Sequence, residues 1–165
     1  MSTRPGLPPL FGFPWERDQE VLFQSRPLVS ERMRDYWDIN LENNPLRTRP
    51  ETDAGAFLAY ILEAAGDILR EMAYPTPASD YIGEKMRRLR RDLRVRDWHD
   101  PLTASEQAKL TQVARLVGSL GDLAETEAER SIVMVINSVV RRDPVAIGHG
   151  LDRLVRTSEV VARGV

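Results

Sequence analysis

The chain contains no cysteine among its 165 residues and only two histidines, His99 and His149. Without cysteine there is no disulfide bond, no thiolate nucleophile and no cysteine-ligated metal, and the redox compartment stays open. The sequence also lacks a glycine-rich phosphate loop, a serine nucleophile motif and a pair of catalytic histidines. These absences leave an enzymatic function unsupported, and we expect no catalytic residue, metal or cofactor.

Long hydrophobic runs are missing as well. The longest mainly apolar stretch is about ten residues, between residues 131 and 140, whereas a bilayer-spanning helix needs about 20. Near the N-terminus, Pro5, Pro8, Pro9 and Pro14 interrupt any apolar segment of the kind a signal peptide requires. We therefore expect no membrane association and a cytoplasmic location.

Lysine is scarce, because only Lys85 and Lys109 among the 23 basic residues are lysine. Such an arginine bias reflects a GC-rich coding sequence as readily as a need for phosphate binding. The net charge is −2, but it is unevenly spread. Residues 51–80 hold six acidic residues and one basic residue, and residues 81–102 hold seven basic and four acidic residues.

The composition is that of an ordinary globular protein, with 42% hydrophobic and 29% charged residues. A chain of this length is expected to form one domain with a self-sufficient core. The periodicity of its apolar residues predicts an all-α fold, a bundle of five to six helices over residues 30–165. The predicted helices are 30–42, 53–72, 79–96, 103 to 118 or 121, 127–141, and one that follows Asp143.

Capping signals place several of these boundaries. Thr103 with Glu106, and Thr126 with Glu129, form the Thr-x-x-Glu pattern of a capping box at a helix start. Asp143 followed by Pro144 predicts another helix start. The run from 132 to 140 is rich in isoleucine and valine, so a buried strand is the alternative there. We favour the helix, because a lone strand would have no partner.

The first 29 residues form a different kind of segment. They contain five of the eleven prolines, which favour extended backbone. They also contain apolar side chains that are costly to leave in water, so we predict an extended arm that docks. The arm either wraps its own bundle or reaches a neighbouring subunit or another protein. The side chains expected to bind are Leu10, Phe11, Phe13, Trp15, Leu22 and Phe23.

A basic stretch at residues 85–96 is the second candidate binding surface. Seven cations in twelve residues could neutralise several phosphates or an acidic protein surface. Aromatic residues for base stacking are missing from this face, and the pI is about 5.8. The alternative is a solvated face, or one that pairs with the acidic segment 51–80. The residues concerned are Lys85, Arg87, Arg88, Arg90, Arg91 and Arg94.

Two short motifs involve the histidines. His99 lies between Asp97 and Asp100. Carboxylate and imidazole groups can ligate a divalent metal. The alternative is that the same residues form a turn above a buried Trp98. Arg142 and His149 are separated by six residues, with a polar residue after the arginine. This spacing resembles the motif of the HEPN helical-domain nucleases.

The HEPN resemblance covers eight residues and implies that Arg142 and His149 would act on an RNA phosphodiester. Pro144 departs from the motif, and helical spacing puts His149 on a polar face with Asp152 and Arg153. The sequence alone does not identify a function. It favours a non-enzymatic interaction or structural subunit of a larger assembly or homo-oligomer, with nucleic-acid binding and a HEPN-like ribonuclease as alternatives.

Overall fold

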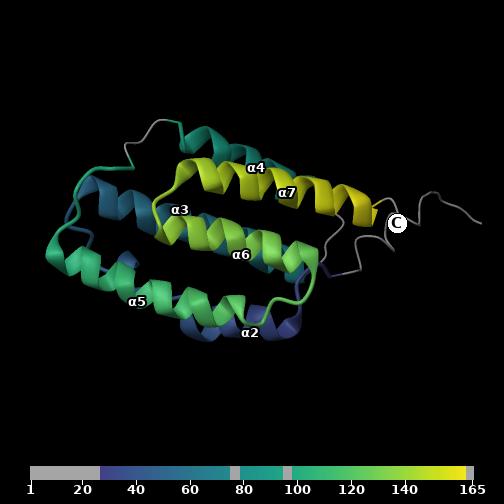
Figure 1. Ribbon diagram of the computed structural model, residues 1–165, viewed down its shortest axis with the longest axis horizontal. Coiled ribbons are helices and arrows are strands. Elements are labelled where there is room, and N and C mark those ends of the chain that lie inside the picture. The colour runs from purple at the N-terminus through teal and green to yellow at the C-terminus, as the bar shows by residue number, and fades with distance from the viewer. Residues whose placement is uncertain (1–26, 75–78, 95–97, 163–165) are drawn as a thin grey trace, which may run out of the picture.

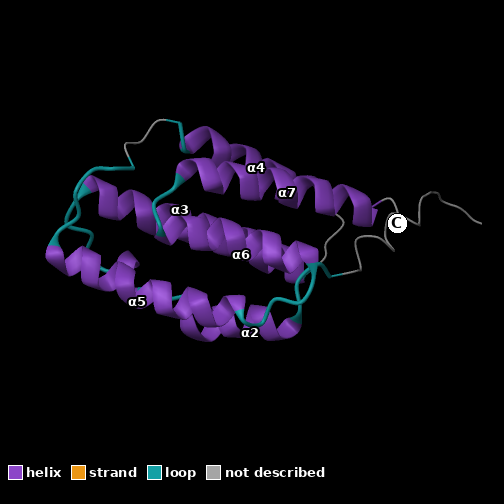
Figure 2. Ribbon diagram, viewed as in Figure 1, coloured by secondary structure: helices purple, strands orange, loops and turns teal. Residues whose placement is uncertain are grey.

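The computed structural model describes residues 27–74, 79–94 and 98–162, with the backbone alone for residues 79–82 and 158–162. These residues form six α-helices and one short 3-10 helix, and no strand occurs among them (Figure 2). The predicted all-α bundle is confirmed. The elements are α2 (Glu31–Asn40), η1 (Pro45–Arg47), α3 (Asp53–Ala73), α4 (Ser79–Asp92), α5 (Ala104–Gly121), α6 (Glu127–Val140) and α7 (Pro144–Ala162).

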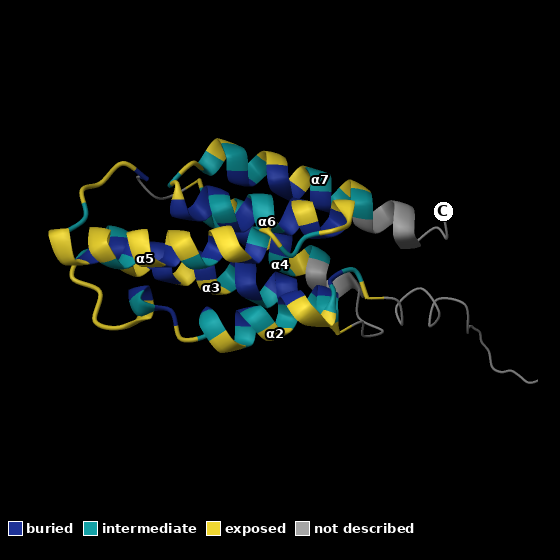
Figure 3. Ribbon diagram, turned by 60° about the horizontal axis from the view of Figure 1, so that its bottom comes forward, coloured by how far each residue is buried: buried dark blue, intermediate teal, exposed yellow. Residues whose placement is uncertain are grey.

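The helices form two layers, each made by three helices that follow one another in the chain (Figure 1). In the first layer α3 lies between α2 and α4, and in the second α6 lies between α5 and α7. Each helix of the first layer packs on a helix of the second, in the pairs α2 with α5, α3 with α6 and α4 with α7. The core lies between the layers, where the buried faces of the helices meet (Figure 3).

The run from 132 to 140 is helical, as predicted, and α6 is the central helix of its layer. Ile132, Val135, Ile136 and Val139 are at most 1% exposed. Helices α3, α5 and α7 all pack against α6, which explains why its sequence has so little polar character.

The predicted capping boxes at Thr103 and Thr126 are both present. Their glutamates also do something that the local pattern does not predict. Glu106 accepts hydrogen bonds from the backbone amides of Glu51 and Thr52 at the start of α3. Glu129 accepts one from the amide of Ser30 at the start of α2. Each buried carboxylate therefore joins the N-termini of two helices from different layers.

Two helix ends differ from the prediction. Helix α4 ends at Asp92 rather than near Arg96, because the backbone tightens there and Arg94 N donates to Arg91 O. Helix α2 ends at Asn40, two residues before Glu42.

Glycine at two positions in α7 suggests that a neighbouring backbone approaches closely, but only one position requires it. A Cβ built on Gly150 would lie 2.7 Å from Val135 Cγ2 and 3.4 Å from the backbone nitrogen of Val135 in α6, so the close approach of a backbone is confirmed there. A Cβ on Gly148 would meet nothing within 4 Å, so the same expectation is wrong for Gly148. In α3, Gly66 accommodates the indole of Trp37, which a Cβ would meet at 1.9 Å.

Candidate interaction surface between helices α3 and α4

Helix α4 lies at the edge of its layer, between α3 and α7 (Figure 1). The residues Ile82, Met86, Leu89 and Leu93 follow one another at helical spacing and form an apolar seam along α4. This seam faces the core, because Met86 and Leu89 are 6% and 2% exposed and Leu93 packs against the core. The side chain of Ile82 lies outside the described residues. The basic residues therefore occupy the sides and the outer face of α4.

Two of these cations turn towards neighbouring helices. Arg90 forms an ion pair with Asp152 of α7, with 2.6 Å between the nearest atoms. Lys85 lies 3.8 Å from the carboxylate of Asp67 on α3. The expected pairing of the basic stretch with the acidic segment 51–80 is thus recorded for Lys85 only.

The other cations remain on the surface. Arg87 pairs with Glu84 one turn earlier in the same helix, and this contact lowers the pKa of Glu84. Arg91 lies 3.9 Å from Asp92. Arg88 and Arg94 are exposed and form no ion pair with another described residue. Exposed pairs contribute about 0–1 kcal/mol, so Arg87 and Arg91 can exchange their partners.

A groove of about 490 Å³, open to solvent, separates the outer faces of α3 and α4. Its α3 wall carries Glu63 and Asp67, and its α4 wall carries Lys85 and Arg88. The remaining lining residues are Tyr60, Ala64 and Leu89. The groove therefore has one acidic wall and one basic wall with a small apolar floor.

Tyr60 closes one end of the groove. Its hydroxyl donates a 2.7 Å hydrogen bond to Asp92 Oδ2, and the pKa of Tyr60 is raised by that bond and by partial burial. The positive charges of Arg88 and Arg91 oppose this shift of the Tyr60 pKa, and Arg88 lines the same groove as Tyr60. The groove itself was not predicted, because its acidic and basic walls lie on two different helices and come together only when α3 and α4 pack.

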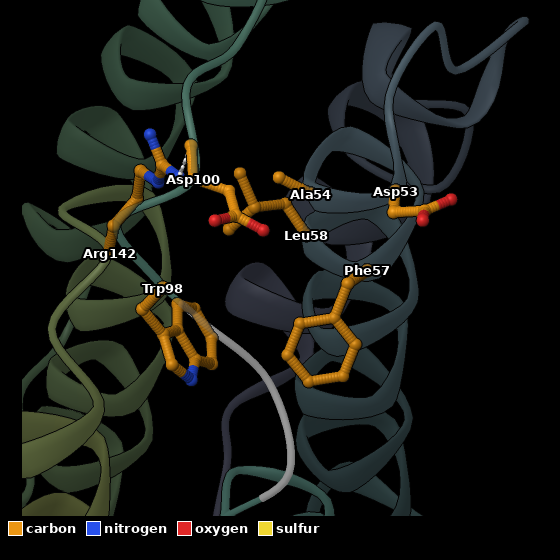
Figure 4. A pocket seen from close by; sticks show the side chains of 7 residues that line it. All are labelled: Asp53, Ala54, Phe57, Leu58, Trp98, Asp100 and Arg142. Carbon is orange, nitrogen blue, oxygen red and sulfur yellow. Dashed lines mark hydrogen bonds between the residues drawn. The ribbon is translucent and has the colours of Figure 1, made fainter.

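A second hollow lies at the corner before α5 and has an open volume of about 290 Å³ (Figure 4). Trp98 is 5% exposed there, and its ring meets Phe57 edge-on with centroids 5.4 Å apart. Arg142, in the left-handed region with φ 58°, donates to the carbonyl of Asp100. The buried nitrogens Trp98 Nε1 and Arg142 Nε have no hydrogen-bond partner among the described residues.

This corner fixes a turn. The indole nitrogen of Trp98 points away from Arg142 and from the Asp100 carboxylate, so the polar groups do not converge on one point (Figure 4). The described residues contain no group of three or more histidine and carboxylate side chains that would suit a metal. The interpretation of 97–100 as a turn above a buried tryptophan is confirmed for its described part, Trp98 to Asp100.

The two residues of the HEPN-like motif have different surroundings. Arg142 is partly buried and engaged with the loop at Asp100, whereas His149 is exposed on α7. The structure records no contact between the two side chains among those of the described residues. Their role in RNA cleavage stays a prediction.

The six arm side chains expected to bind a partner, Leu10, Phe11, Phe13, Trp15, Leu22 and Phe23, lie outside the described residues. The end of the arm is described. Leu28 N donates a 2.9 Å hydrogen bond to Met72 O at the end of α3, and Val29 is 2% exposed. Leu28 and Val29 thus already pack with the helical body.

No described helix is both long enough and apolar enough to cross a membrane. Comparisons with protein-family models, with curated proteins and with solved structures found no match to this chain.

Proposed function

We propose that this protein is a non-enzymatic subunit of a larger assembly or homo-oligomer, and that its N-terminal arm supplies contacts to the partner. The observation that carries the proposal is the anchoring of residues 28 and 29 on α3 and in the core. The helical body holds the arm at its root, so the apolar residues before Pro27 are tethered to the helical body. They are thereby also kept close to any partner that the body contacts.

The energetic reason is the apolar content of the arm. Burying one large apolar side chain contributes about 1.5–3 kcal/mol. Six such side chains, interrupted by prolines that prevent a helical core of their own, gain this energy only against another surface. Docking of the arm is therefore favoured over a solvated tail.

The surface near the root of the arm offers apolar contacts. Tyr74, two residues after Met72, is 50% exposed, and the guanidinium of Arg34 lies 4.7 Å from the centre of its ring. Aromatic and arginine side chains are enriched in protein interfaces, which supports contact with a partner at this end.

The test is the mass of the full chain compared with a variant in which Phe11, Phe13, Trp15 and Phe23 are replaced by Ser. We expect the variant to form a smaller species in light scattering, or to lose the partner that co-purifies with the wild type. A matched control replaces the polar arm residues Thr3, Gln19 and Gln24 by Ala and should behave as the wild type. An unchanged mass and an unchanged set of co-purifying proteins in the Ser variant would refute the proposal.

Nucleic-acid binding is the second candidate, and the exposure of Arg87, Arg88, Arg91 and Arg94 favours it. Glu63, Asp67 and Glu84 lie beside these cations, and their negative charge would oppose a phosphate backbone. A salt titration of RNA and DNA binding tests this candidate. Binding at low salt with a steep salt dependence, reduced when the four arginines are replaced by Ala, would support it, and no binding at low salt would remove it.

A further inference from the structure

The opposite charges on the two walls of the α3–α4 groove are placed in register. At one end Tyr60 of α3 meets Asp92 of α4, and at the other Asp67 of α3 lies beside Lys85 of α4. The two helices therefore run antiparallel. Glu63 and Arg88 line the groove between these two contacts. At each charged level, an acidic residue on α3 stands opposite a basic residue on α4.

This arrangement is self-complementary. Consider a two-fold axis that runs along the groove, parallel to both helices. The rotation places α3 of one copy against α4 of the other, and at the same level along the axis. Glu63 then faces the second copy's Arg88, and Asp67 faces the second copy's Lys85, with each contact made twice. A two-fold interface of this kind uses the same surface on both subunits.

We propose that the α3–α4 groove is a self-association surface whose occupant is the same groove of a second copy of this chain. This inference rests on the proposed function, in which the chain acts as an assembly subunit, and it adds a surface that is separate from the arm. A nucleic acid would use the basic wall alone, and an acidic protein would be repelled by Glu63 and Asp67. A second copy uses both walls.

The internal contacts of the groove do not prevent this pairing. Glu63 pairs with Arg47 at 3.1 Å, and both side chains are more than 40% exposed. Asp67 and Lys85 are 3.8 Å apart, which is long for an ion pair. The exposed pair of Glu63 and Arg47 contributes little in water and can be exchanged when the second copy supplies additional charges. The Lys85 side chain is only 20% exposed, so it keeps its contact with Asp67, and the second copy's Asp67 adds a second carboxylate beside it.

The available area limits the strength of the pairing. Helix α4 has 14 residues and is about 21 Å long, and two adjacent helices are about 20 Å wide. The resulting footprint is about 400 Å² per copy, below the roughly 800 Å² per partner of a standard interface. We therefore expect a reversible dimer whose population rises with protein concentration.

The test uses two charge-reversed forms of the full chain. Glu63→Lys with Asp67→Lys makes both walls basic, and Lys85→Glu with Arg88→Glu makes both walls acidic. Each form repels itself, and we expect its dimer dissociation constant, measured by sedimentation velocity, to rise at least tenfold. In a mixture of the two forms, both pairs of facing walls are of opposite charge, so association should return.

The mixture also separates association from folding, because each chain in the mixed pair keeps its own altered charges. A matched control is Arg115→Glu with Arg156→Glu on α5 and α7. It gives the same net charge of −6 as the all-acidic form, since two reversals subtract four from −2, and should associate as the wild type. Circular dichroism confirms that each form is folded.

Three results would overturn the proposal. In the first, the wild-type chain shows no concentration-dependent association. In the second, the mixture of the two forms associates no better than its components. In the third, the all-basic form binds RNA or an acidic protein more tightly while the mixture does not associate. The arm substitutions leave every groove charge in place. If a groove dimer persists after the arm substitutions, the groove proposal stands without the arm proposal. If arm-dependent assembly persists after charge reversal in the groove, the arm proposal stands without the groove proposal.

Discussion

Replacing Glu106 by Gln tests how strongly one buried carboxylate holds the two layers together. The side chain is 2% exposed and accepts four hydrogen bonds. The donors are the backbone amides of Thr103, Glu51 and Thr52 and the hydroxyl of Thr52, at distances of 2.8–3.1 Å. Gln has nearly the same shape, so the substitution changes charge and hydrogen bonding with little change in packing.

The cost follows from the hydrogen bonds that Gln cannot accept. If its carbonyl oxygen takes the place of Oε2, it still accepts from the amides of Glu51 and Thr52, and its amide group then faces both the Thr103 amide and the Thr52 hydroxyl. The hydroxyl can rotate and accept from the new amide group, but the Thr103 amide can only donate. One buried donor then loses its partner, which costs about 1–3 kcal/mol, and the remaining bonds lose the strength that a charged acceptor gives. We expect a loss of roughly 2–4 kcal/mol in the free energy of unfolding at pH 7.

The pH dependence gives this prediction a second, independent readout. Burial opposes ionisation of Glu106, but the hydrogen bonds from Thr103, Thr52 and Glu51 outweigh it and lower the pKa from 4.5 to about 2. A carboxyl group with a lowered pKa in the folded state stabilises the fold above pH 4.5 and loses that contribution as the pH falls towards 2. The difference between wild type and Glu106→Gln should therefore shrink on acidification.

The assay is urea unfolding followed by circular dichroism at pH 7 and at pH 3. Glu84→Gln serves as the control, because this carboxylate lies on the surface of α4 and pairs only weakly. A Glu106→Gln protein as stable as the wild type at pH 7, or a difference that stays the same at both pH values, would refute the reasoning.

The remaining predictions concern α7, the N-terminus of α6 and the HEPN-like motif. Gly148→Ala should stabilise the protein by about 0.5–1 kcal/mol, because alanine is the better helix former and nothing obstructs its Cβ. Gly150→Ala should destabilise the protein, because the new Cβ would collide with Val135. Thermal unfolding of both variants checks this, and a change of the same sign in both would contradict the prediction. Burial opposes ionisation of Glu129, but hydrogen bonds from Glu125, Ser30 and Thr126 lower its pKa, so Glu129→Gln should also lose most of its effect below the usual pKa; equal effects at pH 7 and pH 3 would speak against this. His149→Ala should leave the rate of RNA degradation unchanged in a fluorogenic assay, because His149 is exposed and Arg142 is engaged with Asp100, and a clear loss of cleavage would support the HEPN-like alternative.

Much of the fold is predictable because its signals are local. Ser30, Thr103, Thr126 and Asp143 each accept a hydrogen bond from the amide three residues later, so a short stretch of sequence contains all that such a cap needs. The helix at 127–140 was the hardest case, because the stiff side chains of valine and isoleucine also suit a strand. This helix lies between α5 and α7 and also packs on α3, so its sequence has little of the polar face that distinguishes a helix from a buried strand.

The long-range features were beyond prediction. Nothing near Glu129 indicates that Ser30, 99 residues away, donates to its carboxylate. The pairing of Arg90 with Asp152 likewise depends on α4 lying beside α7, which follows from the order of helices in two layers. For the candidate surface, the sequence suggested pairing of the basic stretch with the acidic segment 51–80 as one alternative. It did not indicate which acidic residues of α3 would line a groove beside α4, because that depends on how the two helices pack.

Hydrogen exchange on the intact native complex tests the central claim most directly. The claim is that the apolar arm is sheltered, either by the helical body or by a partner. We predict that amides of residues 10–23 exchange slowly in the complex and faster after Phe11, Phe13, Trp15 and Phe23 are replaced by Ser. Rapid, unprotected exchange of these amides in the native complex would contradict the account.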